Sequence, residues 1–217
     1  MPCLPFRLQS SPANSVTPRM KQSRLYCLLL LSLVTLSACG SSMQTPDIKL
    51  NPHPKMRYEI TMVVKDAPGL FDSVTGFMQY DIANEQCAPF EKFIGIYRKP
   101  PGQSPPIVFN RVGDNEYKGQ LYLDFFLDED YYQLGVCHWS LVAAVARLKF
   151  QEASFGQDLL QEQIISQQSV TLYFPKSGYG DNSIKDMNYV GSTMSDAIAQ
   201  HRADFFSITL SAKERFE

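Results

Sequence analysis

The sequence predicts an all-β domain, an antiparallel β-sandwich with little helix. Short segments in which apolar and polar residues alternate recur along the chain, and turns rich in proline and glycine separate them. Two cysteines, Cys87 and Cys137, are available to form one disulfide within this domain. Immunoglobulin-like and transthyretin-like topologies are both compatible with the pattern.

The first strand is expected at residues 57–65, where apolar and polar side chains alternate. A turn containing proline and glycine follows at 66–69. The second strand is expected at 71–82, and Gly76 within it is expected to mark a bulge.

Two short strands are expected at 93–98 and 107–112. Residues 99–106 between them indicate a loop, because their four prolines cannot donate ladder hydrogen bonds. A Gly-Asp-Asn turn at 113–115 then leads into a longer strand at 117–126.

An extended run covers residues 134–150. Alternation predicts one inward face, made of Cys137, Trp139, Leu141, Ala143 and Val145. Trp139 is expected to pack near the disulfide. Immunoglobulin domains place their core tryptophan between the two cysteines, whereas Trp139 follows the second cysteine, so the pattern does not single out that topology.

The last part of the chain is less regular. Residues 158–166 fit a short helix or an irregular strand, and residues 169–174 fit a strand. The segment 175–202 is expected to be a long loop with a short helix at 194–202. A closing strand is expected at 204–211, because its apolar residues alternate.

Residues 20–38 predict a secretory leader. The basic residues Lys21 and Arg24 precede an apolar core at 25–36, and small residues follow it. The core is too short to span a bilayer, which needs about 20 residues. Residues 1–19 contain four prolines and do not fit a leader, so we interpret them as a start-site extension ahead of Met20.

The tetrapeptide Leu36-Ser37-Ala38-Cys39 resembles a bacterial lipobox. This resemblance implies that Cys39 carries a lipid and becomes the first residue of the mature chain, anchored in the membrane. Gly40 after the cysteine favours the outer membrane, facing the periplasm. Residues 39–55 are then expected to be a lipidated tether, and residues 56–217 a single β-sandwich domain.

The mature chain is acidic. Removal of residues 1–38 leaves 179 residues with 16 basic and 22 acidic side chains, because four of the 20 Lys and Arg lie in the removed part, and the formal charge is −6. This length corresponds to one domain. No run of positive charge could follow a phosphate backbone, so nucleic acid is not expected as a partner.

Cysteine use follows from the leader. Cys3 and Cys27 precede the cleavage site, and Cys39 would carry the lipid. The remaining pair, Cys87 and Cys137, would lie in the oxidising periplasm, where disulfides persist. A bridge across this separation stabilises a protein by about 4 kcal/mol on the chain-entropy model.

The sequence contains no motif typical of an enzyme. Nucleophile elbows, P-loops, zinc-binding His-Glu-x-x-His and zinc cysteine–histidine spacings are absent. His138 follows Cys137 directly, which would place the two side chains on opposite faces of a strand. His53 and His201 lie in polar segments. We therefore predict a non-enzymatic protein without a cofactor.

One cluster combines acidic and aromatic residues. The candidate partner-binding residues are Asp124, Asp128, Glu129, Asp130, Tyr131 and Tyr132. Their spacing does not match an EF-hand, so Ca²⁺ is not expected there. The alternatives are a solvated hairpin tip or a patch in which aromatic anchors lie beside charges that attract a protein partner. A second patch is possible around Tyr173, Tyr179, Tyr189 and the loop 176–182.

Four stretches, at 66–69, 128–132, 135–139 and 206–210, resemble small proteobacterial lipoproteins of the toxin-immunity type. This resemblance implies a protein that protects its producer by binding a toxin delivered into the periplasm, and it assigns no catalytic residue. Two other roles stay open: a structural or assembly lipoprotein of an envelope or secretion complex, and a module that binds a small ligand or a glycan.

Overall fold

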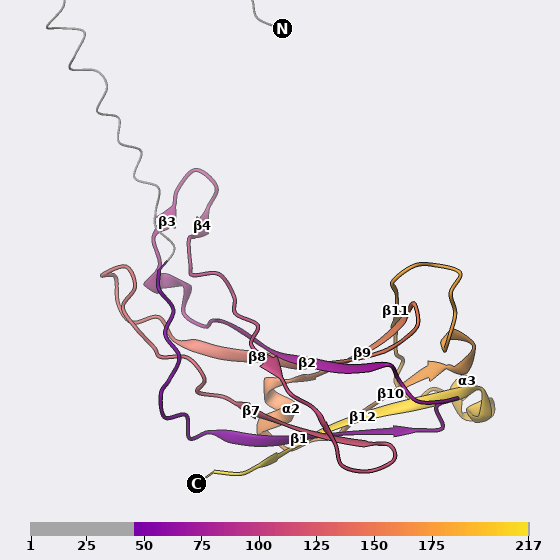
Figure 1. Cartoon of the computed structure of the whole chain (residues 1–217). Coiled ribbons are helices and arrows are strands. Elements are labelled where there is room, and N and C mark those ends of the chain that lie inside the picture. The colour runs from indigo at the N-terminus through magenta and orange to yellow at the C-terminus, as the bar shows by residue number, and fades with distance from the viewer. Residues whose placement is uncertain (1–45, 217) are drawn as a thin grey trace, which may run out of the picture. The chain divides into compact units, whose positions relative to one another are not determined.

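The computed structural model describes residues 46–216. The expected leader, Cys39 and the first part of the tether lie outside these residues. Two five-stranded sheets pack face to face, with one hydrophobic core between them (Figure 1). The predicted antiparallel all-β sandwich with one disulfide and little helix is confirmed.

The first sheet has the strand order β10 (Val170–Pro175), β12 (Phe205–Glu214), β1 (Arg57–Lys65), β7 (Glu116–Tyr122) and β6 (Asn110–Arg111). The second sheet has the order β11 (Met187–Val190), β9 (Ala153–Leu160), β8 (Trp139–Phe150), β2 (Ser73–Ile82) and β5 (Pro106–Ile107). A separate hairpin pairs β3 (Phe90–Glu91) with β4 (Ile96–Tyr97). Neighbouring strands are antiparallel except β9 and β11, which are parallel.

The helices are short. They are α2 (Gln161–Ile165) and α3 (Asp196–Gln200), with single 3₁₀ turns η1 (Glu85–Cys87), η2 (Lys176–Gly178) and η3 (Arg202–Asp204). Helix α2 connects β9 to β10 and packs against β8, β9 and β12, so it lies where the chain passes from one sheet to the other. Its Ile164 is fully buried.

The strands that alternate most clearly in sequence form the centre of the first sheet. On β1, Tyr58, Ile60 and Met62 are buried, and on β12, Phe206 and Ile208 are buried. The predicted inward faces of these two strands are therefore confirmed. Strand β12 continues to Glu214, beyond the predicted end, because it pairs with β1 as far as Tyr58.

The predicted inward face of β8 is correct only in its first half. Tyr80 lies opposite Leu141, whereas Gln79 lies opposite Ala143, so Val142 is an extra residue that forms a bulge. The bulge inverts the alternation, and the residues that reach the core beyond it are Ala144, Ala146 and Leu148. Ala143 and Val145 are buried on the other face of the sheet.

The bulge predicted at Gly76 is wrong, because Gly76 lies in regular register opposite Ala146. Glycine is needed here instead because other groups approach its Cα closely. A Cβ atom at this position would lie 2.6 Å from the ring of Phe109 and 2.8 Å from the carbonyl oxygen of Val145. The chain between β5 and β6 therefore packs directly on the backbone of β2.

Several predicted boundaries are wrong for a common reason. Residues 107–112 do not form one strand, because the chain crosses from the second sheet at β5 to the first sheet at β6. The strand expected to reach residue 126 ends at Tyr122. Strand β9 begins at Ala153, ahead of the predicted 158–166 element, and β11 lies inside the predicted long loop. Tertiary pairing decides these elements, and local pattern does not reveal it.

The predicted disulfide is present. The Cα atoms of Cys87 and Cys137 are 5.2 Å apart, and the bridge joins η1 to the segment before β8. Both cysteines are buried, and Trp139 packs in the same core.

The described end of the predicted tether is docked on the domain. Ile48 packs against the core, and Leu50 forms a β-bridge with Phe126. The carboxylate of Asp124 accepts hydrogen bonds from the backbone N–H groups of Lys55 and Met56, at 2.8 and 3.0 Å. Residues 48–55 form no helix and no regular strand, as expected of a tether, but these contacts attach them to the domain.

We predict that Asp124→Ala lowers the free energy of unfolding by about 1–3 kcal/mol, because two backbone donors lose a charged acceptor. Denaturant unfolding of the whole chain measures this change, and hydrogen exchange should accelerate at Lys55 and Met56. Asp114→Ala is the matched control, since the structure gives its side-chain carboxylate no hydrogen bond within residues 46–216. Equal unfolding midpoints for the two variants would contradict the docking role of Asp124.

Candidate protein-binding surface

The β3–β4 hairpin carries the most exposed group of apolar side chains. Phe93 at its tip is 99% exposed and Ile94 is 62% exposed, and Phe90 and Ile96 beside them are half exposed. Figure 1 shows the hairpin projecting away from the two sheets. We call Phe90, Phe93, Ile94 and Ile96 the hairpin tip.

Local sequence explains this hairpin. Phe90 pairs with Tyr97 and Glu91 with Ile96, which leaves residues 92–95 as the turn. Gly95 adopts a φ of +69°, a left-handed conformation that favours glycine, and its N–H donates to the carbonyl of Glu91 at 2.8 Å. The turn residues Lys92, Phe93 and Ile94 consequently point away from the body of the protein.

The base of the hairpin is fixed by covalent and ionic contacts. Arg98 pairs with Glu91 at 3.0 Å across the hairpin. Lys99 Nζ lies 2.9 Å from Asp81 and 3.3 Å from Glu85, and its hydrogen bond to Asp81 contributes most to raising its pKa. The disulfide lies immediately before the hairpin. A fixed base therefore presents an exposed tip.

The predicted acidic cluster lies at the same end of the domain, in the loop 123–138. Asp128 accepts from the backbone N–H of Trp139 at 2.9 Å and lies 2.7 Å from His138 Nδ1. Glu129 pairs with Lys49 at 2.8 Å. Asp130 accepts from the N–H groups of residues 134 and 135, at 3.1 and 3.3 Å. Each of these carboxylates forms hydrogen bonds or an ion pair with another part of the domain, and these contacts hold the loop in place.

The two tyrosines of the cluster are half-buried and pack against the core. Trp139 donates to the hydroxyl of Tyr131 at 3.0 Å, and that hydroxyl donates to the carbonyl of Leu127 at 3.2 Å. Burial raises the pKa of both Tyr131 and Tyr132. The contacts that the structure shows for these two tyrosines are made within the domain. Binding of a partner by them stays a prediction.

Asn84, which precedes η1 and the hairpin, links this part of the chain to the acidic loop. Its side chain donates to the carbonyl of Val136 at 2.8 Å and accepts from the N–H of His138 at 2.7 Å. The bridge between Cys87 and Cys137 reinforces this junction. A loop that carries exposed acidic side chains is thus attached next to the base of the hairpin.

The second predicted patch is mostly part of the packing. Tyr179 stacks on Phe150 with a centroid distance of 4.3 Å, and Tyr189 stacks on Phe155 at 5.3 Å. The hydroxyl of Tyr189 donates to Asp181 at 2.6 Å, and this hydrogen bond, together with those from Ser183, lowers the pKa of the Asp181 carboxyl to about 2. Tyr173, the third member, lies under the guanidinium of Arg202 at 5.0 Å.

Sequence reasoning missed the hairpin tip because it assigned residues 93–98 to a strand. The available signal was the placement of Gly95 between apolar residues, in a short stretch bounded by Pro89 and Pro100. A glycine at such a position indicates a turn, and the apolar residues before it then have no sheet to cover them.

Two further findings concern the described part of the chain. Within residues 46–216, no group of three or more His, Cys, Asp or Glu side chains could hold a metal ion. In the same residues no helix has the length and apolar character needed to cross a membrane. Cys137 is bonded to Cys87 and therefore has no free thiol beside His138.

We predict that loss of the disulfide destabilises the chain by up to about 4 kcal/mol and loosens the hairpin. Reduction should lower the denaturant midpoint and accelerate tryptic cleavage after Lys92 and Arg98. A chain with Cys87→Ala and Cys137→Ala should match the reduced protein and no longer respond to reductant. Equal cleavage rates for oxidised and reduced protein would show that the bridge does not hold the hairpin base.

Comparison of the chain with family models, curated proteins and solved structures finds no match.

Proposed function

We propose that this chain is an outer-membrane-anchored periplasmic lipoprotein that acts as a protein-binding module, an immunity or inhibitor protein against an antibacterial effector. The hairpin tip carries this proposal, because it presents adjacent apolar side chains to solvent from a fixed base. Exposed apolar clusters of this kind are typical of binding surfaces.

The energetics of binding favour the tip as the anchor. Phe93 is almost completely exposed, so a partner that covers it removes most of an aromatic side chain from water. Aromatic residues that enter a pocket dominate the energy of many interfaces. Inhibition follows if the pocket that receives the tip is the effector's active site or docking surface.

The surroundings of the tip supply charge for orientation. Asp128 and Asp130 are exposed on the adjacent loop, while Lys92 is exposed in the turn itself. Charges at the rim of an interface mainly affect the association rate and the choice of partner. In this proposal the predicted acidic residues steer the partner, and the hairpin tip supplies the affinity.

The lipobox supports the proposed location. Cys39 lies seven positions before Pro46, the first described residue, and a chain of that length spans at most about 25 Å. A lipid on Cys39 would therefore hold the domain close to the membrane, where an effector enters the periplasm. An assembly lipoprotein of an envelope complex would use the same surface and the same anchor, and it is the second candidate.

We predict that the full chain, expressed in bacteria, incorporates a palmitate analogue through Cys39. Cys39→Ser should abolish the label, because the thiol is the acceptor. Cys27→Ser is the matched control and should keep the label, since that cysteine lies in the leader. A label that persists in Cys39→Ser would overturn the proposed anchor without bearing on the hairpin.

We predict that Phe93→Glu weakens capture of the partner at least about 30-fold, the factor that corresponds to 2 kcal/mol. The lipidated chain is purified from membranes and mixed with secreted and envelope proteins of its producer, and mass spectrometry quantifies what binds. Val190→Glu is the control, because Val190 is 83% exposed on β11. The identified partner is then titrated against both variants.

Each outcome has one meaning. One stoichiometric partner, bound by the parent and the control but not by Phe93→Glu, supports the proposal, and deletion of the gene should then make cells sensitive to that partner. Several components of an envelope machine would favour the assembly role. Equal capture by Phe93→Glu, or no captured protein, would contradict binding through the hairpin tip.

A further inference from the structure

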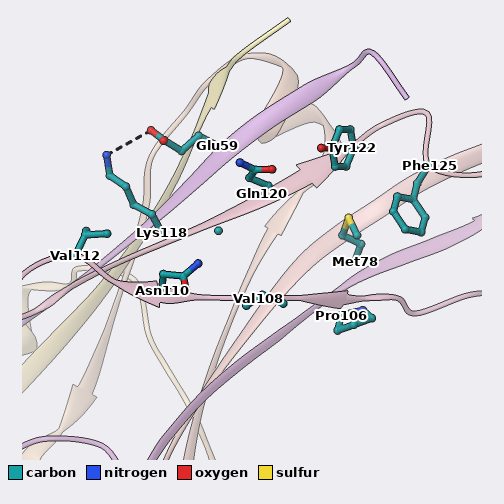
Figure 2. A pocket seen from close by; sticks show the side chains of 11 residues that line it. Glu59, Met78, Pro106, Val108, Asn110, Val112, Lys118, Gln120, Tyr122 and Phe125 are labelled. Carbon is teal, nitrogen blue, oxygen red and sulfur yellow. Dashed lines mark hydrogen bonds and ion pairs between the residues drawn. The ribbon is translucent and has the colours of Figure 1, made fainter. Parts of the chain in front are cut away.

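A groove runs along β1 and β7 on the outer face of the first sheet and reaches around the edge of β7. It consists of three depressions with volumes of about 600, 100 and 340 Å³. Glu59 and Gln120 line both the first and the second depression, and Arg57 and Arg215 line both the second and the third. We call this surface the β7 groove. Figure 2 shows its largest part, between β7 and the segment that joins β5 to β6.

The β7 groove is cationic although the protein is acidic. Its charged Lys, Arg, Asp and Glu side chains are Lys55, Arg57, Lys118, Arg215 and Glu59. Four cationic side chains and one carboxylate thus line the groove, whereas the mature chain has 16 basic and 22 acidic residues. This local reversal of charge favours an anionic partner.

Glu59 orders two of the cations, Lys118 and Arg215. Its Oε1 lies 3.4 Å from Lys118 Nζ and 3.2 Å from Arg215 Nη2. Partial burial opposes ionisation, but the hydrogen bonds and charges of Arg215 and Lys118 outweigh it and lower the pKa of Glu59. Glu116 Oε1 also lies 4.0 Å from Lys118 Nζ, so Lys55, Lys118 and Arg215 are set against the two carboxylates of Glu59 and Glu116, and the cations are still in excess.

The edge of β7 in this groove has no partner strand beyond Lys118. Strand β6 pairs with β7 only through Asn110 and Arg111. Alternate residues of β7 bond to opposite sides: the carbonyl of Glu116 accepts from Val112 on the β6 side, at 2.9 Å. By the same alternation, the N–H and C=O of Gln120 face the groove. No strand within residues 46–216 pairs with them there.

A strand added at this edge would meet two different environments. A residue opposite Gln120 would share its face of the sheet, where Lys118 and the other cations lie. The residues before and after it would point to the other face. There the groove is lined by Met78 of the core and by the partly buried Phe125, both labelled in Figure 2.

We propose that the β7 groove binds an extended acidic peptide segment of a protein, which adds as a strand antiparallel to β7 and in line with β6. The observations specify acidic residues at alternate positions and apolar residues between them. An anionic glycan would satisfy the cations but not the backbone N–H and C=O of Gln120, so a peptide is favoured. This inference does not rest on the function proposed for the hairpin tip.

We predict that the full lipidated chain binds a fluorescein-labelled hexapeptide of alternating glutamate and valine, measured by fluorescence anisotropy in detergent. The chain with Lys118→Gln and Arg215→Gln should bind at least tenfold more weakly. Lys149→Gln with Lys176→Gln is the matched control, because it removes the same charge and breaks the exposed Lys149–Asp186 pair. Thermal unfolding verifies that every variant is folded.

Backbone methylation distinguishes strand addition from general attraction to anions. In an antiparallel pair, the peptide residues that share a face with Gln120 also donate their N–H groups to β7. N-methylation of the glutamates should therefore weaken binding at least tenfold, whereas N-methylation of the valines should have little effect on binding. A lysine–valine hexapeptide should not bind.

The proposal fails on any of three results. The glutamate–valine peptide does not bind, it binds as well to the groove variant as to the control, or it tolerates N-methylation at the glutamates. The last result, together with equal competition by a sulfated polysaccharide, would show a general polyanion surface instead of strand addition. None of these results depends on capture of a partner by Phe93.

Discussion

The buried side chain of Tyr80 joins the two sheets. Tyr80 belongs to β2 in the second sheet, yet its hydroxyl donates to the carbonyl of Tyr122 on β7 in the first. Its ring packs edge-on against Phe126 at 5.1 Å and stacks with Phe125 at 6.1 Å. Burial raises the pKa of the hydroxyl, so it remains a protonated donor. One side chain thereby fixes the segment that leads from β7 into the acidic loop.

Both proposed surfaces arise where the sandwich leaves groups without partners. At the hairpin, four turn residues connect two strands that are only two residues long and pair with neither sheet. Phe93 and Ile94 in this turn are therefore exposed to solvent. At β7, the chain arrives from β5 in the other sheet and joins the first sheet only at the two residues of β6, so the backbone of Gln120 has no strand partner on that side. Natural proteins usually protect such edges, which makes an open one a candidate for pairing.

The sequence predicted what depends on local periodicity. The alternation of β1 and β12, the disulfide and the short helix near residue 196 are all confirmed. The elements it missed depend on distant contacts. Nothing near Val142 announces a bulge, which exists because β2 sets the register, and β11 is a strand only because β9 lies beside it. The hairpin tip was missed because its apolar residues, Phe93, Ile94 and Ile96, are of the kinds that also form strands, so the short pattern fits either a strand or an exposed turn.

The two surfaces respond differently to salt. The mature chain carries a formal charge of −6, which repels an acidic peptide at long range. At physiological ionic strength, charges separated by more than about 8 Å are largely screened, so the cations of the β7 groove act on a segment that is already close. Attraction there weakens as salt rises. Burial of Phe93 is apolar and follows no such dependence. A partner that uses both surfaces would therefore keep its anchor and lose its added strand at high ionic strength, which separates the two contributions physically.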